Sequence, residues 1–128
     1  METYRVDHLH LISPNIEETK QWYCDVLGGS VTFEGEFKGN KVYYVDLKGF
    51  NIIIIEKMPE EEPRPADIHT RIGIDHFGVA VQDMDAAARE LKAKGVTFTV
   101  EPMQVRPGLR IAYIEAPDKV RIELSERT

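Results

Sequence analysis

This chain of 128 residues lacks several features that would each define a class of protein. It has a single cysteine, Cys24, so no disulfide can form within the chain. It has no basic excess: its net charge is −6, which argues against binding to nucleic-acid phosphates. Its longest apolar run, residues 52–55, is far too short to span a bilayer, and we expect no secretory signal in the opening residues METYRV. These absences favour a cytoplasmic protein that binds neither nucleic acid nor membrane.

Two segments of the chain share one pattern. Residues 6–11 read VDHLHL and residues 74–79 read IDHFGV, so an Asp-His pair recurs with a displacement of 68 residues between His8 and His76. Seven residues after each histidine comes a short polar residue, Asn15 or Asp83, whose side chain we expect to accept a backbone N–H at the start of a helix. The sequence therefore predicts two copies of one module.

Both copies continue with the same order of elements. Apolar residues at helical spacing follow each cap, at 16, 19, 23 and 27 in the first copy and at Met84, Ala87, Ala88 and Leu91 in the second. Glycines at 28–29 and 95 end these helices. Three strands then follow in each copy, at 31–33, 42–47 and 52–56, and at 96–99, 109–116 and 120–125. We interpret residues 35–39 as a hairpin turn. The predicted fold class is α+β, with βαβββ modules over about 1–57 and 73–128 and a solvated linker over about 58–72.

The second copy and the end of the chain resemble the vicinal oxygen chelate superfamily, which includes glyoxalase I, extradiol dioxygenases, methylmalonyl-CoA epimerase and the bleomycin-resistance proteins. The resemblance lies in IDHFGVAV at 74–81 with Asp83, and in APDKVRIEL at 116–124. The latter is similar to the family ending DPDGN-x-IEL, with Lys119 where glycine is usual. The resemblance implies a glyoxalase-like fold, in which both modules form one pseudo-symmetric, cup-shaped mixed sheet, and it implies a homodimer.

In that family, metal ligands come from the first and last strands of the modules. The resemblance therefore implies that His8, His76 and Glu123 hold one divalent ion of Fe, Mn, Zn, Ni or Co, within one chain or across a dimer. Two imidazoles and one carboxylate leave positions open for a substrate or oxygen. A fourth ligand depends on the alignment of the copies. Spacing along the chain selects Glu56, whereas the local motif KGFNII set against DKVRIE selects Ile53.

Other residues are candidates for contacts with a substrate. His10 shares its strand face with His8 but stands where the second copy has Gly78. We expect it to be either a general base or a wall of the pocket. Glu56 is a second candidate catalytic residue, and Tyr44 and Tyr113, on matching strands, are candidates for the substrate pocket.

The resemblance implies chelation of a small oxygenated organic substrate and stabilisation of an enolate- or catecholate-like intermediate. One hypothesis is a lyase or isomerase of the glyoxalase type, with Glu56 as ligand and base. A second is a ring-cleaving dioxygenase, which a three-ligand site favours. The alternative is a metal-free protein of the bleomycin-resistance type that binds a drug or metabolite. Such a binder has no need of His8, His76 and Glu123 together.

Overall fold

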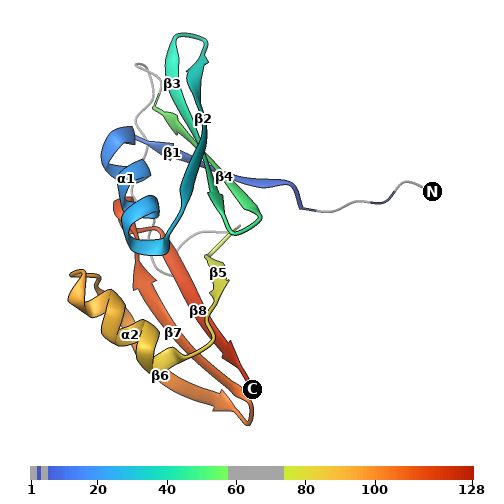
Figure 1. The fold of residues 1–128 in the computed structure, drawn as a ribbon, viewed down its shortest axis with the longest axis vertical. Helices are drawn as coiled ribbons and strands as arrows, with labels where there is room; N and C mark the ends of the chain where they lie inside the picture. Colours follow the sequence, from blue (N-terminus) through green and yellow to red (C-terminus); the bar gives the residue numbers. More distant parts are fainter. Residues whose placement is uncertain (1–2, 4–5, 58–73) are drawn as a thin grey trace. The chain divides into compact units, whose positions relative to one another are not determined.

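The structure is a computed structural model that describes residues 3, 6–57 and 74–128 (Figure 1). The chain divides into two compact units, Met1–Arg64 and Pro65–Thr128, and each contains one βαβββ module. The predicted linker, at about 58–72, lies outside the described residues.

The first unit is a mixed sheet with one helix on it. Its elements, in chain order, are β1 (His8–Ser13), α1 (Ile16–Leu27), β2 (Ser30–Phe37), β3 (Asn40–Leu47) and β4 (Phe50–Glu56). The strand order is β1-β4-β3-β2, in which β1 and β4 are parallel and the other neighbours are antiparallel. The helix packs on β3 and β4, and it buries Ile16, Thr19 and Tyr23 of the predicted stripe. Val45, Ile52 and Ile54 are buried in the sheet.

The second unit repeats this arrangement. Its elements are β5 (Phe77–Ala80), α2 (Met84–Ala93), β6 (Phe98–Arg106), β7 (Leu109–Glu115), a short 3-10 turn (Pro117–Lys119) and β8 (Arg121–Arg127). The strand order is β5-β8-β7-β6, and the neighbours β5 and β8 are again parallel. Of the predicted helical stripe, Met84, Ala88 and Leu91 are buried and Ala87 is half-buried.

The prediction of an α+β fold with two βαβββ modules is confirmed. The hydrogen-bonded ladders of the described residues form a four-stranded sheet in each unit. A cup-shaped sheet shared by both modules stays a prediction. What places the candidate residues is the register within each sheet, because it decides which side chains of the first, third and last strands lie beside one another.

The two helix starts differ in detail. Asp83 accepts a hydrogen bond from the backbone N–H of Ala86 at 3.0 Å, so this predicted cap is confirmed. Asn15 occupies the capping position, but its side chain makes no capping hydrogen bond and instead donates to Glu18 at 2.7 Å. The predicted role of the Asn15 side chain is therefore wrong, since Glu18 offers its amide a charged acceptor.

The second strand of each module is longer than the sequence predicted. Strand β2 continues to Phe37, and the turn after it contains only Lys38 and Gly39, with φ values of 52° and 81°. Two successive residues with positive φ are enough to close an antiparallel hairpin, so the predicted turn at 35–39 is too long. Strand β6 begins at Phe98 and runs to Arg106, because it pairs with β7 along that length through irregular register.

Candidate functional site

The repeated Asp-His dipeptide makes the same contact in both units. Nδ1 of His8 lies 2.8 Å from Oδ2 of Asp7, and Nδ1 of His76 lies 2.8 Å from Oδ2 of Asp75. An ionised carboxylate can only accept hydrogen bonds, so each imidazole donates through Nδ1. The nitrogen presented to any further partner is then Nε2. In metal proteins this is how an outer carboxylate fixes the orientation of a ligating imidazole.

The second of these pairs is the better enclosed. The side chains of His76 and Asp75 are 29% and 35% exposed, whereas those of His8 and Asp7 are 42% and 89% exposed. The ring of His76 also lies edge-on to the ring of Tyr113, with centroids 5.1 Å apart. His76 is therefore the more firmly held of the two histidines.

Glu123 faces His76 within the second unit. It lies on β8, directly beside Gly78 on the parallel strand β5. Nε2 of His76 is 2.9 Å from Oε2 of Glu123. The hydroxyl of Tyr113 donates to that same oxygen at 2.8 Å, and the hydroxyl of Ser125 donates to Oε1 at 3.0 Å. A partly buried carboxylate is thus held by two hydroxyl groups and aimed at an imidazole.

The ionisation of these groups suits a cation. Burial raises the pKa of Glu123, whereas hydrogen bonds from Tyr113 and Ser125 and the neighbouring His76 lower it. The lowering effects are together the larger, so the pKa of Glu123 lies below its ordinary value. Burial and the hydrogen bond to Glu123 both raise the pKa of Tyr113. At neutral pH Glu123 is therefore ionised while the phenol keeps its proton. An imidazole nitrogen and a carboxylate oxygen that face one another are donors a divalent transition metal prefers.

The register of the first unit places Ile53 where the second unit has Glu123. Ile53 lies opposite Tyr44 on β3, just as Glu123 lies opposite Tyr113 on β7. The structure therefore agrees with the alignment by local motif, which selected Ile53, and not with the alignment by spacing, which selected Glu56. An isoleucine cannot coordinate a metal, so the first unit offers no carboxylate at this position.

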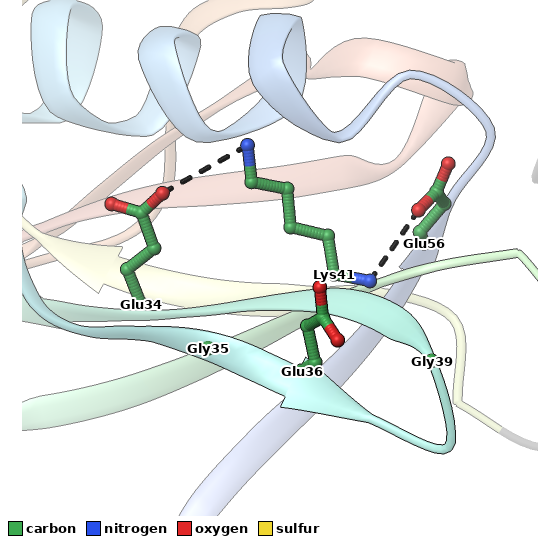
Figure 2. A pocket seen from close by; sticks show the side chains of 6 residues that line it. All are labelled: Glu34, Gly35, Glu36, Gly39, Lys41 and Glu56. Carbon is green, nitrogen blue, oxygen red and sulfur yellow. Dashed lines mark hydrogen bonds and ion pairs between the residues drawn. The ribbon is translucent and has the colours of Figure 1, made fainter.

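Glu56 lies on the opposite face of β4 from Ile53, because side chains alternate along a strand. It is exposed and lines a pocket of about 420 Å³ together with Glu34, Glu36 and Lys41 (Figure 2). Its Oε2 accepts the backbone N–H of Lys41 at 3.4 Å. The ammonium group of Lys41 lies 3.8 Å from Oε1 of Glu34 (Figure 2). The structure does not bring Glu56 to the face that carries Ile53.

His10 and Tyr44 line a second cavity of the first unit, of about 290 Å³. Its other walls are Phe33, Glu36, Phe37, Val42, Ile53 and Ile55. The two sequence-predicted contact residues of this unit are therefore brought together in a mainly apolar setting. Tyr113, the other predicted pocket residue, instead belongs to the cluster around Glu123.

The predicted metal ligands are divided between the units, with His8 in the first and His76 and Glu123 in the second. Over the described residues, no three His, Cys, Asp or Glu side chains form a group that could hold a metal by themselves. No helix among the described residues is long and apolar enough to cross a membrane.

The comparison with known families agrees with the fold. The model of the Glyoxalase/Bleomycin resistance protein/Dioxygenase superfamily matches residues 5–124. The chain belongs to this superfamily. Some members of this superfamily bind a divalent metal, among them a FosX mutant complexed with Mn(II).

Among curated proteins, the chain is similar to the uncharacterized protein YwkD of Bacillus subtilis, with 29% identity over 129 residues that cover 95% of this chain and 96% of YwkD. It is also similar to a probable chloroplastic lactoylglutathione lyase of Arabidopsis thaliana, with 45% identity over 108 residues that cover 66% of this chain but 31% of the plant protein. The likeness to YwkD, which extends over nearly all of both chains, is to a protein described as uncharacterized.

Among solved structures, a glyoxylase/bleomycin resistance protein/dioxygenase domain from Frankia sp. EAN1pec has a TM-score of 0.82 at 21% identity, covering 99% of this chain and 100% of that one. A mutant of the fosfomycin resistance protein FosX from Listeria monocytogenes, complexed with Mn(II) and 1S,2S-dihydroxypropylphosphonic acid, has a TM-score of 0.74 at 19% identity, covering 99% and 93%. At these identities the likeness shows the fold.

Sequence reasoning missed the residues that hold the candidate ligands. The sequence pattern marks Asp7 and Asp75 only as part of the repeat, and it does not mark Ser125 or Arg121 as residues of a site. Their signals were present, since an aspartate precedes each histidine, and alternation along β8 places residues 121, 123 and 125 on one face.

Proposed function

We propose that this chain is a divalent-metal-dependent enzyme that acts on a small oxygenated organic molecule, with His8, His76 and Glu123 as the metal ligands. The observation that carries the proposal is the pair formed by His76 and Glu123, whose donor atoms are 2.9 Å apart. Each donor has its own orienting partner, Asp75 or Tyr113. His8 joins the set because its neighbouring aspartate makes the same contact with Nδ1.

The residues of the chain prepare these donors. Tyr113 and Ser125 keep Glu123 ionised and fix both of its oxygens. Each aspartate engages Nδ1 of its histidine, so Nε2 is the nitrogen that would coordinate the metal. When bound, an Fe, Mn, Zn, Ni or Co ion supplies a Lewis acid that polarises adjacent oxygens of a substrate.

Two reaction classes agree with this donor set. The likeness to a probable lactoylglutathione lyase supports a lyase or isomerase. Ile53, at the position equivalent to Glu123, leaves two imidazoles and one carboxylate, a set typical of non-haem iron oxygenases. We infer that His10 contacts the substrate, because it is the histidine that lines the apolar cavity of the first unit. Glu56 lines a different pocket, so we assign it no part in the chemistry.

We also propose that the protein is a homodimer. Strands β2 and β6 are edge strands of their sheets and carry half-exposed apolar side chains, at Phe33, Phe37, Met103 and Val105. Edge strands of this kind are usually covered by a neighbour. Sedimentation velocity at micromolar concentration, with and without metal, tests this; a monomer under both conditions would contradict it.

Metal analysis tests the main proposal. Protein purified without a chelator is analysed by mass spectrometry for each transition metal, then stripped and reloaded with the five ions one at a time. We expect stoichiometric binding of one ion, and its loss in His8→Ala, His76→Ala and Glu123→Gln. The matched control is His10→Ala, which removes an imidazole from the same strand face as His8 and should leave the metal bound. Thermal melting of each variant confirms that it is folded.

A chain that never binds metal stoichiometrically would overturn this proposal and favour the second candidate function. That candidate is a metal-free binder of a drug or metabolite. The observation in its favour is the apolar cavity of about 290 Å³, whose walls include Ile53 and Tyr44. In that case, ligand binding measured by calorimetry should weaken in Ile53→Asp and stay unchanged in His76→Ala.

A further inference from the structure

A buried arginine contacts the residues that orient the His76–Glu123 pair. Arg121 lies two residues before Glu123 on β8, and its side chain is only 5% exposed. Its Nη1 donates to Oδ2 of Asp75. That oxygen is the one that accepts the hydrogen bond from Nδ1 of His76 at 2.8 Å. The guanidinium group therefore holds the carboxylate that orients the imidazole.

The same guanidinium group also contacts the partner of the carboxylate ligand. Its Cζ lies 4.5 Å from the centroid of the Tyr113 ring, a distance at which a cation is attracted by the ring face. The hydroxyl at the far end of that ring donates to Oε2 of Glu123. One buried cation thus touches both residues that orient the two donor groups.

We propose that Arg121 is the positioning residue of this site, which fixes His76 through Asp75 and Glu123 through Tyr113. The inference rests on the proposed function, because it concerns the same two donors. Its support lies in the contrast with the first unit. The residue beside His8 on the last strand there is Asn51, and the Asp7 side chain is 89% exposed. The imidazole of His76 is therefore held in place before any ion binds, and that of His8 much less so.

Two effects of Arg121 on a bound cation oppose one another, and this makes the test sharp. Its positive charge repels a cation. If Arg121 acted only through this charge, replacing it with a neutral residue would make the protein bind metal more tightly. Its hold on Asp75 and Tyr113 orients the donors, and losing an orienting partner typically weakens metal binding by about 10–100-fold. We expect Arg121→Met to weaken binding within that range. Arg121→Lys keeps the charge but not the planar fork, so it should show most of the same loss.

The first measurement is the dissociation constant for zinc, from competition with a chromophoric chelator, in the wild type, Arg121→Met and Arg121→Lys. Asn51→Ala, at the register-equivalent position of the first unit, is the matched control and should bind zinc like the wild type. Wild-type affinity in both Arg121 variants, or tighter binding in Arg121→Met, would overturn the proposal. If Arg121→Met does not fold, Arg121→Lys alone carries this test.

The second measurement uses metal-free protein, so it separates this inference from the proposed function. The Nδ1–H of His76 is observed by NMR after labelling histidine with ¹⁵N. We expect a slowly exchanging, hydrogen-bonded Nδ1–H in the wild type and in Asn51→Ala, and its loss in both Arg121 variants. A wild type that binds no zinc but shows this pattern would refute the metal site alone. A signal unchanged in the Arg121 variants would refute the role of Arg121.

Discussion

The substitution Tyr113→Phe removes a single oxygen atom. It tests how much the hydroxyl of Tyr113 contributes to metal binding by orienting the candidate ligand Glu123. The hydroxyl of Tyr113 donates to Oε2 of Glu123 at 2.8 Å, and Ser125 donates to Oε1 at 3.0 Å. The substitution therefore removes one of two hydroxyl donors and leaves the ring, with its contacts to Arg121 and His76, in place.

The expected size of the effect follows from these contacts. A hydrogen bond to a charged group contributes about 1.5–3 kcal/mol. Loss of an outer-shell partner lowers metal affinity by about 10–100-fold, which corresponds to roughly 1.4–2.7 kcal/mol. Ser125 still holds the other oxygen of Glu123 after the substitution. We therefore expect the lower part of that range, a dissociation constant raised by about tenfold.

The assay is competition for zinc against a chelator of known affinity, at fixed pH and salt. Tyr44→Phe is the control, because Tyr44 occupies the equivalent place on β3 but lies opposite Ile53, whose side chain can accept no hydrogen bond. Its zinc affinity should equal that of the wild type. If the two tyrosine variants lose affinity equally, or if Tyr113→Phe loses none, the hydroxyl does not orient the ligand and the reasoning fails.

Three further predictions concern stability and are read from urea unfolding. Leu91→Ala should cost about 2–5 kcal/mol, because this side chain of α2 is only 6% exposed; a cost near zero would mean that the helix does not pack there. Gly29→Ala should cost about 1–3 kcal/mol, because its Cβ would lie 2.6 Å from Cγ1 of fully buried Val45, and a neutral result would show that the contact relaxes freely. The hydrogen bond from Lys41 is the largest cause that lowers the pKa of Glu17 to about 2, from an ordinary value of 4.5. The stabilising effect of ionised Glu17 is complete above pH 4.5 and is lost as the pH falls toward 2. The free energy of unfolding of the wild type should therefore fall more than that of Glu17→Gln over this interval. Parallel pH profiles of the two proteins would refute this.

The modules could be predicted because their signals are local. The Asp83 cap, the glycine stop at 95 and the apolar stripe ending at Leu91 all lie within a few residues of what they specify. The lengths of β2 and β6 could not be predicted in the same way. They depend on how far each strand pairs with its neighbour, and residues such as Gly35 have low intrinsic preference for a strand.

The candidate site also contains residues that local sequence signals predict and residues that they do not. The repeat of the Asp-His dipeptide selected His8 and His76, and the terminal motif selected Glu123, from short stretches of sequence. The supporting contacts join residues that are far apart, such as Asp75 with Arg121, separated by 46 residues. No periodicity along the chain encodes such a pair, because it arises only when β5 and β8 lie side by side.

The choice between Glu56 and Ile53 shows why register is the better guide in a duplicated chain. Counting residues from the histidine fails as soon as the copies differ in loop length, whereas a ladder fixes which side chains face one another. By register, Glu123 corresponds to Ile53 and Arg121 to Asn51. The copies thus share a backbone and an Asp-His pair but differ in the chemistry around it. The second unit gathers charged groups around His76, and the first gathers apolar walls around His10. Ile53→Asp, which places a carboxylate at the position that corresponds to Glu123, should therefore alter the apolar cavity of the first unit and leave the His76–Glu123 contact of the second unit unchanged.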